Sequence, residues 1–425
     1  MSSGHDLREN LSTVIAGILG FMLVVGTALS AAYGIPLIRS APTLLLLGFF
    51  VVSAVSTRRL RRLTSFHKLS VALFILLVIG ILHTRSPVHG SYKALLVLLY
   101  WVVFGIAFFN VFTTHRHVAS LMIGMGLGGV TYVLLMWFFE GSPLDILSAA
   151  NIFFRLALAG NQNPLSLGRV MSVSMIVLLW FLSDRPIGRF SLLAIPILPL
   201  AFGYLVATGS KGPVAGTIVA VGVFGALRAS RWGRVVALGS LSLLVALFVF
   251  ALVNADPDHM AHSRLLRTGP ASFGRRLDSW KTAFDGFASG TPVEMLVGHG
   301  TGDFSYLVRS ADVTEYPHNI FLEALYEVGI VGLAVLIGIL AAPLVMIRRF
   351  ATSDKANGHP QVRGLIATAV ALYVFAVVTA QVSGDLSTND LIPISGAIMV
   401  ALAAGTLRGS QPAVGATATT APITV

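Results

Sequence analysis

The sequence contains no cysteine, and only 11% of its 425 residues are charged. The lack of cysteine excludes disulfide bonds and thiolate metal sites. Soluble domains average roughly 25% charged residues, whereas this chain is 55% hydrophobic, with a mean hydropathy of +0.83. No periodic repeat occurs. The composition therefore predicts a polytopic membrane protein.

Apolar runs of roughly 17 to 25 residues, which can cross a ~30 Å hydrocarbon layer, recur along the chain. We interpret about twelve of them as transmembrane helices, two of them short. They are Leu11–Ala32, Pro36–Val55, Leu69–Leu82, Ala94–Phe112, Val118–Phe139, Val170–Leu182, Phe190–Ala207, Pro213–Leu227, Val235–Val253, Asn319–Ile347, Leu365–Val382 and Leu391–Leu407. The first exceeds a signal-peptide core and is expected to be retained. We predict an all-α fold in which residues 1–425 form a single integral membrane domain.

Lysine and arginine residues set the orientation of such a protein. With the N-terminus in the cytoplasm, most of the 29 basic residues lie on the cytoplasmic side. The segment 255–317, between the ninth and tenth helices, is then a large periplasmic loop. Anchoring to anionic lipid explains most of the net charge of +11, so no nucleic-acid partner is expected. Residues 408–425 are predicted to be a disordered tail.

The periplasmic loop contains the sequence RRLDSWKTAFDGF. Its apolar residues recur at spacings of three, four and three: Leu277, Trp280, Phe284 and Phe287. This spacing predicts an amphipathic helix that lies on the outer leaflet of the membrane.

Several basic residues are candidates for binding a diphosphate. Arg275 and Arg276 offer forked donors that match phosphate oxygens, and Arg264 and Arg267 precede them. Lys211 lies between two glycines, before a helix that we expect to begin at Pro213, where backbone donors and an ammonium suit a phosphate. The alternative is that Lys211 only extends to the membrane interface.

Three further polar stretches have simpler interpretations. Asn161–Pro164 is a turn, or else hydrogen-bonds sugar hydroxyls. Gly298–Phe304, the sequence GHGTGDF, is interpreted as a tight turn rather than an anion-binding nest, and it does not match a P-loop. Asp256–Asp258, followed by His259, is interpreted as a turn rather than a Mg²⁺ or Mn²⁺ site. We therefore predict no metal site.

The sequence YPHNIFLEALYEVGIVG places His318 where a polar segment enters a membrane span. Pro317 suits the first position of a helix, which puts His318 in the first turn. The helix dipole there disfavours the imidazolium, so a neutral imidazole is expected, as a general base requires. The alternative is that His318 is only an interfacial cap.

Acidic residues follow on one face of this helix. Glu323 and Glu327 lie four and eight residues after Asn319, and carboxylates inside a span are costly unless they face protein or a wet cavity. Gly329 and Gly332 are expected to let a neighbouring helix approach.

The last outward connection, Ser383–Asp390, is most simply interpreted as a hydrated loop. Alternatively, Asp385 reaches His318 and fixes its tautomer.

The spacing of His318, Asn319, Gly329 and Gly332 matches H-[NSQ]-x9-G-x-x-G, the motif of the O-antigen ligase and polymerase superfamily. The layout of about twelve spans with a large external loop is also similar. In that loop the family has an arginine four residues before a tryptophan and a glycine-rich turn. The corresponding residues are Arg276, Trp280, Gly298, Gly300, Gly302 and Phe304. The chain therefore resembles this superfamily over nearly its whole length.

The resemblance implies a GT-C-like membrane glycosyltransferase that is inverting and uses no metal or other cofactor. It implies that His318, beside Asn319, is the base and that Arg276 binds the diphosphate of an undecaprenyl carrier. The family usually has an arginine where this sequence has Lys211, and a lysine lacks the bidentate fork.

The function implied is that of an O-antigen ligase, which transfers O-antigen from undecaprenyl diphosphate to lipid A-core. The implied location is the bacterial cell inner membrane, multi-pass among membrane lipids, with the active site facing the periplasm. One alternative is an O-antigen polymerase. Another is a lipid-linked sugar flippase or transporter, which would carry charges at the membrane midplane on broken helices.

Overall fold

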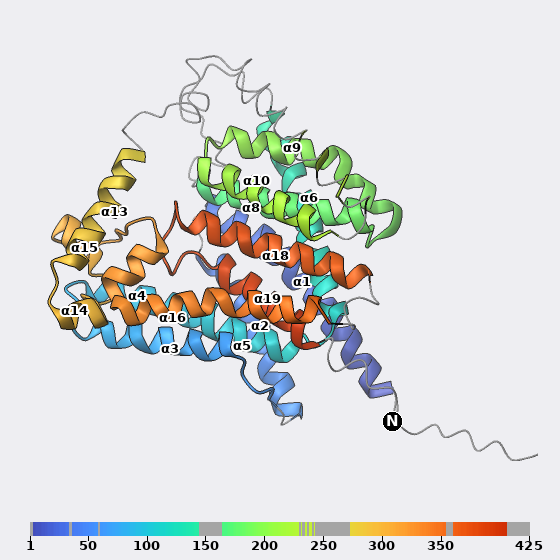
Figure 1. Ribbon diagram of the computed structural model, residues 1–425. Helices are drawn as coiled ribbons and strands as arrows, with labels where there is room; N and C mark the ends of the chain where they lie inside the picture. Colours follow the sequence, from blue (N-terminus) through green and yellow to red (C-terminus); the bar gives the residue numbers. More distant parts are fainter. Residues whose placement is uncertain are drawn as a thin grey trace, which may run out of the picture.

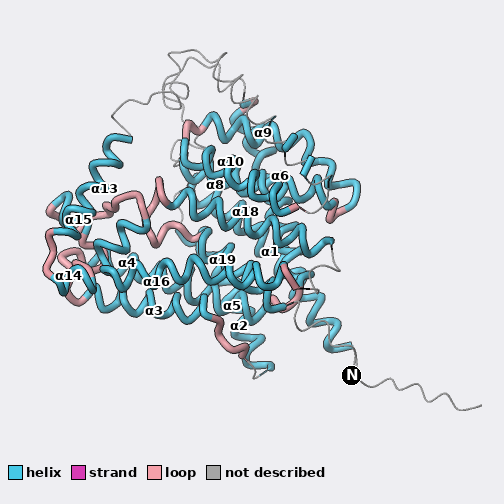
Figure 2. The backbone as a smooth tube through the Cα atoms, in the orientation of Figure 1, coloured by secondary structure: helices cyan, strands magenta, loops and turns pink. Residues whose placement is uncertain are grey.

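A computed structural model describes residues 3–33, 36–57, 60–143, 164–228, 273–353 and 360–405, and a few positions between 231 and 242. These residues form helices joined by short connections, and they include no strand (Figure 2). The helices are α1 (Ser3–Tyr33), α2 (Pro36–Thr57), α3 (Ser65–Ile81), α4 (Pro87–Val97), η1 (Leu98–Val103), α5 (Phe104–Val111), α6 (His115–Glu140), α8 (Pro164–Asp184), η3 (Gly188–Leu193), α9 (Ala194–Ala207), α10 (Lys211–Leu227), α13 (Phe273–Ala288), α14 (Pro292–Val297), α15 (Phe304–Arg309), α16 (Ile320–Ala351), α18 (Pro360–Ala380) and α19 (Leu391–Gly405).

Seven helices of the described part are long and apolar enough to cross a membrane, and four shorter helices are also apolar. Every predicted apolar run coincides with a helix except Val235–Val253, which lies largely outside the described residues. The all-α polytopic membrane fold is therefore confirmed. The number of spans, about twelve, and the complete loop 255–317 stay predictions, and the tail 408–425 lies outside the described residues.

Glycines allow α1 and α6 to pack closely along their length. A Cβ atom added to Gly20 would overlap the carbonyl group of Leu121, and one added to Gly124 would overlap that of Gly17. Small residues at such positions let helix backbones touch, which is how membrane helices gain packing without a hydrophobic driving force between them.

Helix ends from distant parts of the sequence meet at one end of the bundle. Lys93 of α4 binds Glu323 of α16, and Arg169 of α8 binds Asn389 before α19. The short helices α14 and α15 and the amphipathic helix α13 lie beyond this end (Figure 1). Arginines cluster at the other ends, where α8, α10 and α16 finish: Arg185, Arg228, Arg348 and Arg349.

Helix α13 confirms the predicted amphipathic helix. Ala283 and Phe287 pack against Phe304 and Tyr326, in a small apolar cluster separate from the main core. On the same helix Leu277 and Phe284 are exposed. One edge of the apolar face thus attaches α13 to α15 and α16, and contact of the other edge with the outer leaflet stays a prediction.

Candidate active site

His318 lies just before α16 rather than inside its first turn. The helix begins at Ile320, and the side-chain oxygen of Asn319 accepts from two backbone N–H groups of the first turn, at 3.0 and 3.2 Å. The prediction that Pro317 starts the helix is therefore wrong. An asparagine cap satisfies amide groups that would otherwise lack partners, which a proline cannot do, and this cap fixes the start of the helix.

The backbone of His318 is left-handed, with φ of 59°. A non-glycine residue in this region costs on the order of 1–3 kcal/mol and persists where the surroundings hold it. The ring of Tyr316 meets the imidazole edge-on, with 4.7 Å between the centroids. Such strained residues are concentrated at functional sites.

One nitrogen of the His318 imidazole forms no hydrogen bond with the part of the chain that the structure describes. Its Nδ1 atom is buried and has no hydrogen-bond partner among the described residues. Burial and the charge of Arg276 lower the pKa of His318, against the opposing charges of Glu315 and Asp385. The imidazole is therefore neutral at neutral pH, through burial rather than through a place in the first helical turn, and is able to accept a proton.

Arg276 approaches His318 from the first turn of α13. It is half-buried, and burial lowers the pKa of its guanidinium group, which nevertheless stays charged. The neighbouring Arg275 is exposed. The structure thus brings Arg276 and His318 together from two elements, whereas Arg264 and Arg267 lie outside the described residues.

Asp385 is buried in the connection between α18 and α19, so the interpretation of this connection as a hydrated loop is wrong. Its carboxylate accepts from the hydroxyl group of Ser387 at 2.9 Å and from the backbone N–H of Thr388 at 2.7 Å. Burial opposes ionisation, but the charge of Lys93 and these hydrogen bonds lower the pKa of Asp385. The proposed hydrogen bond to His318 is not formed within the described structure, and Asp385 acts on His318 through its charge.

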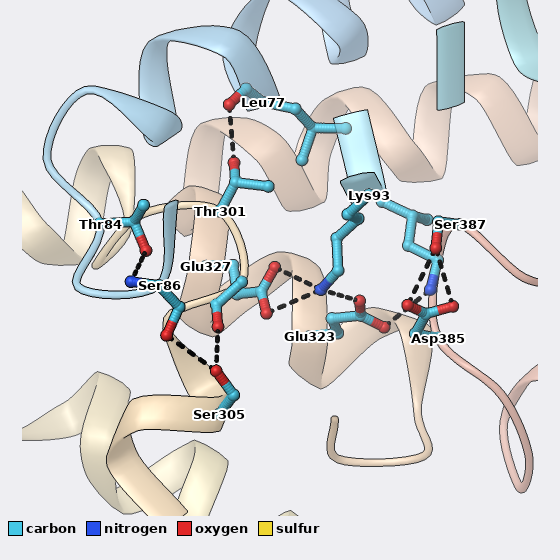
Figure 3. Close-up of polar contacts among 12 residues, drawn as sticks. Leu77, Thr84, Ser86, Lys93, Thr301, Ser305, Glu323, Glu327, Asp385 and Ser387 are labelled. Atoms are coloured by element: carbon cyan, nitrogen blue, oxygen red, sulfur yellow. Dashed lines mark hydrogen bonds and ion pairs between the residues drawn. The ribbon is translucent and has the colours of Figure 1, made fainter. Parts of the chain in front are cut away.

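Glu323 and Glu327 share a buried lysine. The Nζ atom of Lys93, in α4, lies 2.6 Å from one oxygen of Glu323 and 2.7 and 2.8 Å from the oxygens of Glu327 (Figure 3). All three side chains are at most 1% exposed. The second oxygen of Glu323 accepts from the backbone N–H of Leu386 at 2.9 Å. The prediction that these carboxylates face protein is confirmed.

The glycine-rich stretch Gly298–Phe304 is a tight turn, as predicted. Gly298, Gly300 and Gly302 all have positive φ, and a Cβ on Gly300 would lie 2.7 Å from the Cα of Thr84. The hydroxyl group of Thr301 donates to the carbonyl oxygen of Leu77 at 2.8 Å (Figure 3). The turn therefore packs backbone to backbone against its neighbours, and this packing accounts for the glycines.

Asp303, in the same turn, forms an ion pair with Arg85, which donates to both carboxylate oxygens at 3.0 and 2.5 Å. The hydroxyl group of Tyr326 donates to Asp303 at 3.0 Å. Burial opposes the ionisation of Asp303, but Arg85 outweighs it and lowers the pKa of the carboxyl group. These contacts attach the turn to α16 through Tyr326.

Gly329 interrupts α16, with φ of 71° and ψ of −169°. A Cβ atom there would overlap the carbonyl group of Leu296 at the end of α14. Close approach at Gly329 is thus confirmed, although the neighbour is a short helix of the external segment. At Gly332 the nearest atoms belong to Val328, one turn earlier in the same helix, so the predicted approach of a neighbouring helix is not seen there.

Lys211 is exposed and is the first residue of α10, so the prediction that this helix begins at Pro213 is wrong by two residues. A proline is tolerated in a first helical turn, where its missing N–H group would have no intrahelical partner. A Cβ on Gly212 would lie 2.9 Å from a methyl group of Val382, at the end of α18. Lys211 therefore lies at the same end of the bundle as His318.

The remaining candidates concern sugars and metals. Asp256–Asp258 and most of Asn161–Pro164 lie outside the described residues. Within the described ranges, no group of three or more histidine, aspartate or glutamate side chains is arranged to hold a metal ion.

A cavity of about 330 Å³ adjoins Tyr316. Apolar residues of α1, α6, α8 and α19 form much of its wall, and Arg169, Thr388 and Asp390 add polar groups. Arg169 also donates to the side-chain oxygen of Asn389 at 2.7 Å. Because Tyr316 contacts His318, the cavity lies next to the imidazole.

Sequence reasoning did not single out Lys93, Arg85 or Arg169. Lys93 directly precedes the apolar run that begins at Ala94. The signal available was the pair of carboxylates inside α16, which require a cation somewhere else in the chain. No local pattern identifies which basic residue supplies it.

The helices, together with the polar groups around His318, define an all-α polytopic membrane protein with a basic site beside a histidine. Residues 196–337, which include His318, Arg276 and Lys211, match the family model described as O-antigen ligase. This match supports the O-antigen ligase superfamily, as the motif predicts, and a function of the O-antigen ligase or polymerase type. No curated protein matches the chain significantly.

Proposed function

We propose that the protein is an inverting glycosyltransferase that transfers O-antigen from undecaprenyl diphosphate to a sugar hydroxyl group of lipid A-core. The observation that carries this proposal is the Nδ1 atom of a neutral His318, which has no partner among the described residues and lies near Arg276 within the matched segment. A base next to a cation is what displacement of a diphosphate by a hydroxyl group requires.

In the proposed reaction, His318 takes the proton of the acceptor hydroxyl group while the hydroxyl oxygen attacks the anomeric carbon of the donor sugar. The new carbon–oxygen bond forms as the bond to the diphosphate breaks, which inverts the anomeric configuration. The leaving diphosphate carries the negative charge, and Arg276 stabilises it, helped by Arg275 and Lys211. Asn319 caps α16 and thereby positions His318.

The cavity beside Tyr316 supports a lipid-linked donor. Its wall of residues from α1, α6, α8 and α19 is compatible with part of an isoprenoid chain, and its polar groups lie at the side of Tyr316 and His318. We place the site at the periplasmic face of the inner membrane, because arginines gather at the opposite ends of α8, α10 and α16.

An O-antigen polymerase would use the same donor with another glycan as acceptor. The two functions are separated in cells that make O-antigen. Loss of a ligase leaves lipid A-core uncapped while long glycan accumulates on the carrier. Loss of a polymerase leaves the core capped with single repeat units.

A flippase is the second candidate, and a specific observation favours it. Lys93, Glu323 and Glu327 form a buried charge cluster, and α16 is broken at Gly329, as transporters often show. However, Glu327 is only the eighth residue of α16, about 10 Å from its start at 1.5 Å per residue. The cluster thus lies near the end of the bundle rather than at its middle.

The direct test is transfer in detergent by the purified protein, with undecaprenyl diphosphate-linked O-antigen as donor and lipid A-core as acceptor. We expect product of inverted configuration, formed at the same rate in EDTA, because the proposed reaction uses basic side chains to hold the diphosphate. If the purified protein is folded but forms no product, the result would favour the flippase. Loss of transfer in EDTA, with recovery in Mg²⁺, would contradict the proposed metal-independent reaction.

A further inference from the structure

Lys93 lies among more carboxyl groups than one ammonium group can neutralise. Its ammonium group binds Glu323 and Glu327 directly, and Asp385 is close enough for its charge to act on it. All four side chains are buried, and Figure 3 shows them together. One cation thus lies among three buried carboxylates.

Such a cluster is not explained by stability. Taking charges out of water costs about as much as their attraction returns, and apolar residues of similar volume are often as stable. Ionisable groups buried in a membrane protein are therefore candidates for a role in function.

The contacts of the cluster connect it to both sides of His318. Glu323 lies one turn into α16, and its backbone N–H donates to the carbonyl oxygen of Asn319 at 2.9 Å. One carboxylate oxygen of Glu323 binds Lys93, and the other accepts from the backbone N–H of Leu386. Leu386 directly follows Asp385, so this side chain joins the helix after His318 to the loop that carries Asp385.

Glu323 depends on Lys93 to make both contacts. A buried carboxylate without a cation becomes protonated or moves toward water. A protonated group has lost part of its acceptor capacity. Glu327 in turn fixes the ammonium group through two contacts from the next turn of α16.

We propose that Lys93 is a positioning residue, which keeps Glu323 aimed at Leu386 and thereby holds the Asp385 carboxylate in place behind His318. There the negative charge of Asp385 stabilises the imidazolium that forms when His318 takes a proton. This role rests on the proposed function of His318 as a base, and Lys93 itself does not touch the substrate.

Other charged groups also act on His318. Arg276 of α13 disfavours the imidazolium, whereas Glu315, in the segment before α16, favours it. The neighbouring Tyr316 contacts the ring. None of these groups is bonded to the Lys93 cluster in the described structure, so a change at Lys93 leaves them in place.

The test is the substitution Lys93→Met in the full-length protein. The measurement is the rate at which diethyl pyrocarbonate modifies His318, followed by mass spectrometry as a function of pH. The reagent attacks the neutral imidazole, so the midpoint of the curve reports protonation of His318 without any requirement for activity. If His318 is not a base, transfer survives His318→Ala, whereas this curve still tests the positioning role.

The sign of the shift separates positioning from a direct effect of charge. If Asp385 moves away, the imidazolium loses a stabilising charge, and the midpoint falls by on the order of half a pH unit or more. Deleting the cation alone would raise the midpoint instead. A rise, or no shift in a folded variant, would overturn the proposal. Lys68→Met, at an exposed lysine of α3, is the matched control and should leave the midpoint unchanged.

A second variant keeps the proposal testable if Lys93→Met does not fold. Glu323→Gln retains the side-chain volume, but it replaces one of the two oxygens by an NH₂ donor. Because Lys93 and Leu386 bind different oxygens of Glu323, the amide then presents a donor to one of these two donors. We expect faster hydrogen exchange of the segment Ser383–Asp390 together with a lower midpoint for His318. Unchanged exchange in this variant would show that Glu323 does not hold the loop, and the positioning role would be wrong.

Discussion

At the scale of single residues, His318 combines two features that are rarely found together. Its left-handed backbone carries a conformational cost, and its buried Nδ1 atom has no partner in the described structure. A histidine that only capped α16 would need neither, because Asn319 already supplies the cap. Both features are consistent with an imidazole kept ready to accept a proton from a ligand.

Arg276→Ala should lower kcat of transfer by roughly 10²- to 10³-fold, because the diphosphate leaves without its principal cation. Arg276→Lys should recover only part of the rate, since one ammonium group cannot reproduce the guanidinium fork. Steady-state rates in detergent provide the measurement. Lys281→Ala, at an exposed cation of the same helix, is the control. Equal losses for Arg276→Ala and Lys281→Ala would rule out a specific role for Arg276.

The pH dependence of transfer should reflect the lowered pKa of His318. A base works in its neutral form, so activity is lost as pH falls through that pKa. We expect half-maximal kcat below the ordinary imidazole value of about pH 6.5. In Arg276→Lys the charge remains, so the midpoint should stay low, whereas Arg276→Ala should raise it. A wild-type midpoint above pH 7 would be inconsistent with this assignment.

At the scale of elements, the break in α16 fits the helix to the external segment. Gly329 lies in a region of φ and ψ that is nearly exclusive to glycine, and the end of α14 touches its Cα. The break follows Glu327 by two residues, so the charged first part of α16 is separated from its apolar remainder. The close packing of the end of α14 against α16 therefore requires a glycine at this position.

Gly329→Ala should destabilise the protein by at least about 1–3 kcal/mol, because the added Cβ forces a strained backbone and also meets the carbonyl group of Leu296. Thermal unfolding in detergent is the measurement. Gly222→Ala, in α10, is the control, because nothing lies within 4 Å of its added Cβ and alanine favours a helix. Melting temperatures that change equally for the two variants would contradict the role of Gly329.

The elements could be predicted from the sequence to different degrees. Apolar runs located the helices because lipid requires about 20 apolar residues for each span. The starts of helices depend on local competition, and the cap at Asn319 overrides the preference of Pro317. The partners of Glu323 could not be predicted, because Lys93 lies 230 residues away in the sequence. The sequence predicted only that this face of the helix meets protein or a wet cavity rather than lipid.

At the scale of the whole molecule, the candidate site and the arginine-rich helix ends lie at opposite ends of the bundle. His318, Arg276 and Asp385 lie close enough for their charges to interact, at the end of the bundle where α16 begins. Helices α13, α14 and α15 lie beyond this end (Figure 1), and the arginines at the ends of α8, α10 and α16 lie at the opposite end. In an inner membrane, arginine-rich ends remain in the cytoplasm. We therefore propose that the site lies on the periplasmic side, where a glycan carrier would present its sugar.

A topology reporter tests this orientation. Thr291 lies between α13 and α14, so alkaline phosphatase fused there should be active, because that enzyme folds only after export. A fusion after Arg348, at the far end of α16, is the matched control and should be inactive. Activity in the control and not at Thr291 would reverse the orientation and place the site in the cytoplasm.

The central claim, that His318 is the catalytic base, is tested most directly by transfer in detergent with His318→Asn. Asparagine tolerates the left-handed backbone, so this variant should fold normally while losing the base. We expect kcat to fall by about 10²- to 10⁴-fold, while donor binding is preserved through Arg276. His83→Asn, at an exposed histidine, is the control and should leave kcat unchanged. Transfer at the wild-type rate by folded His318→Asn would show that the imidazole is not the base.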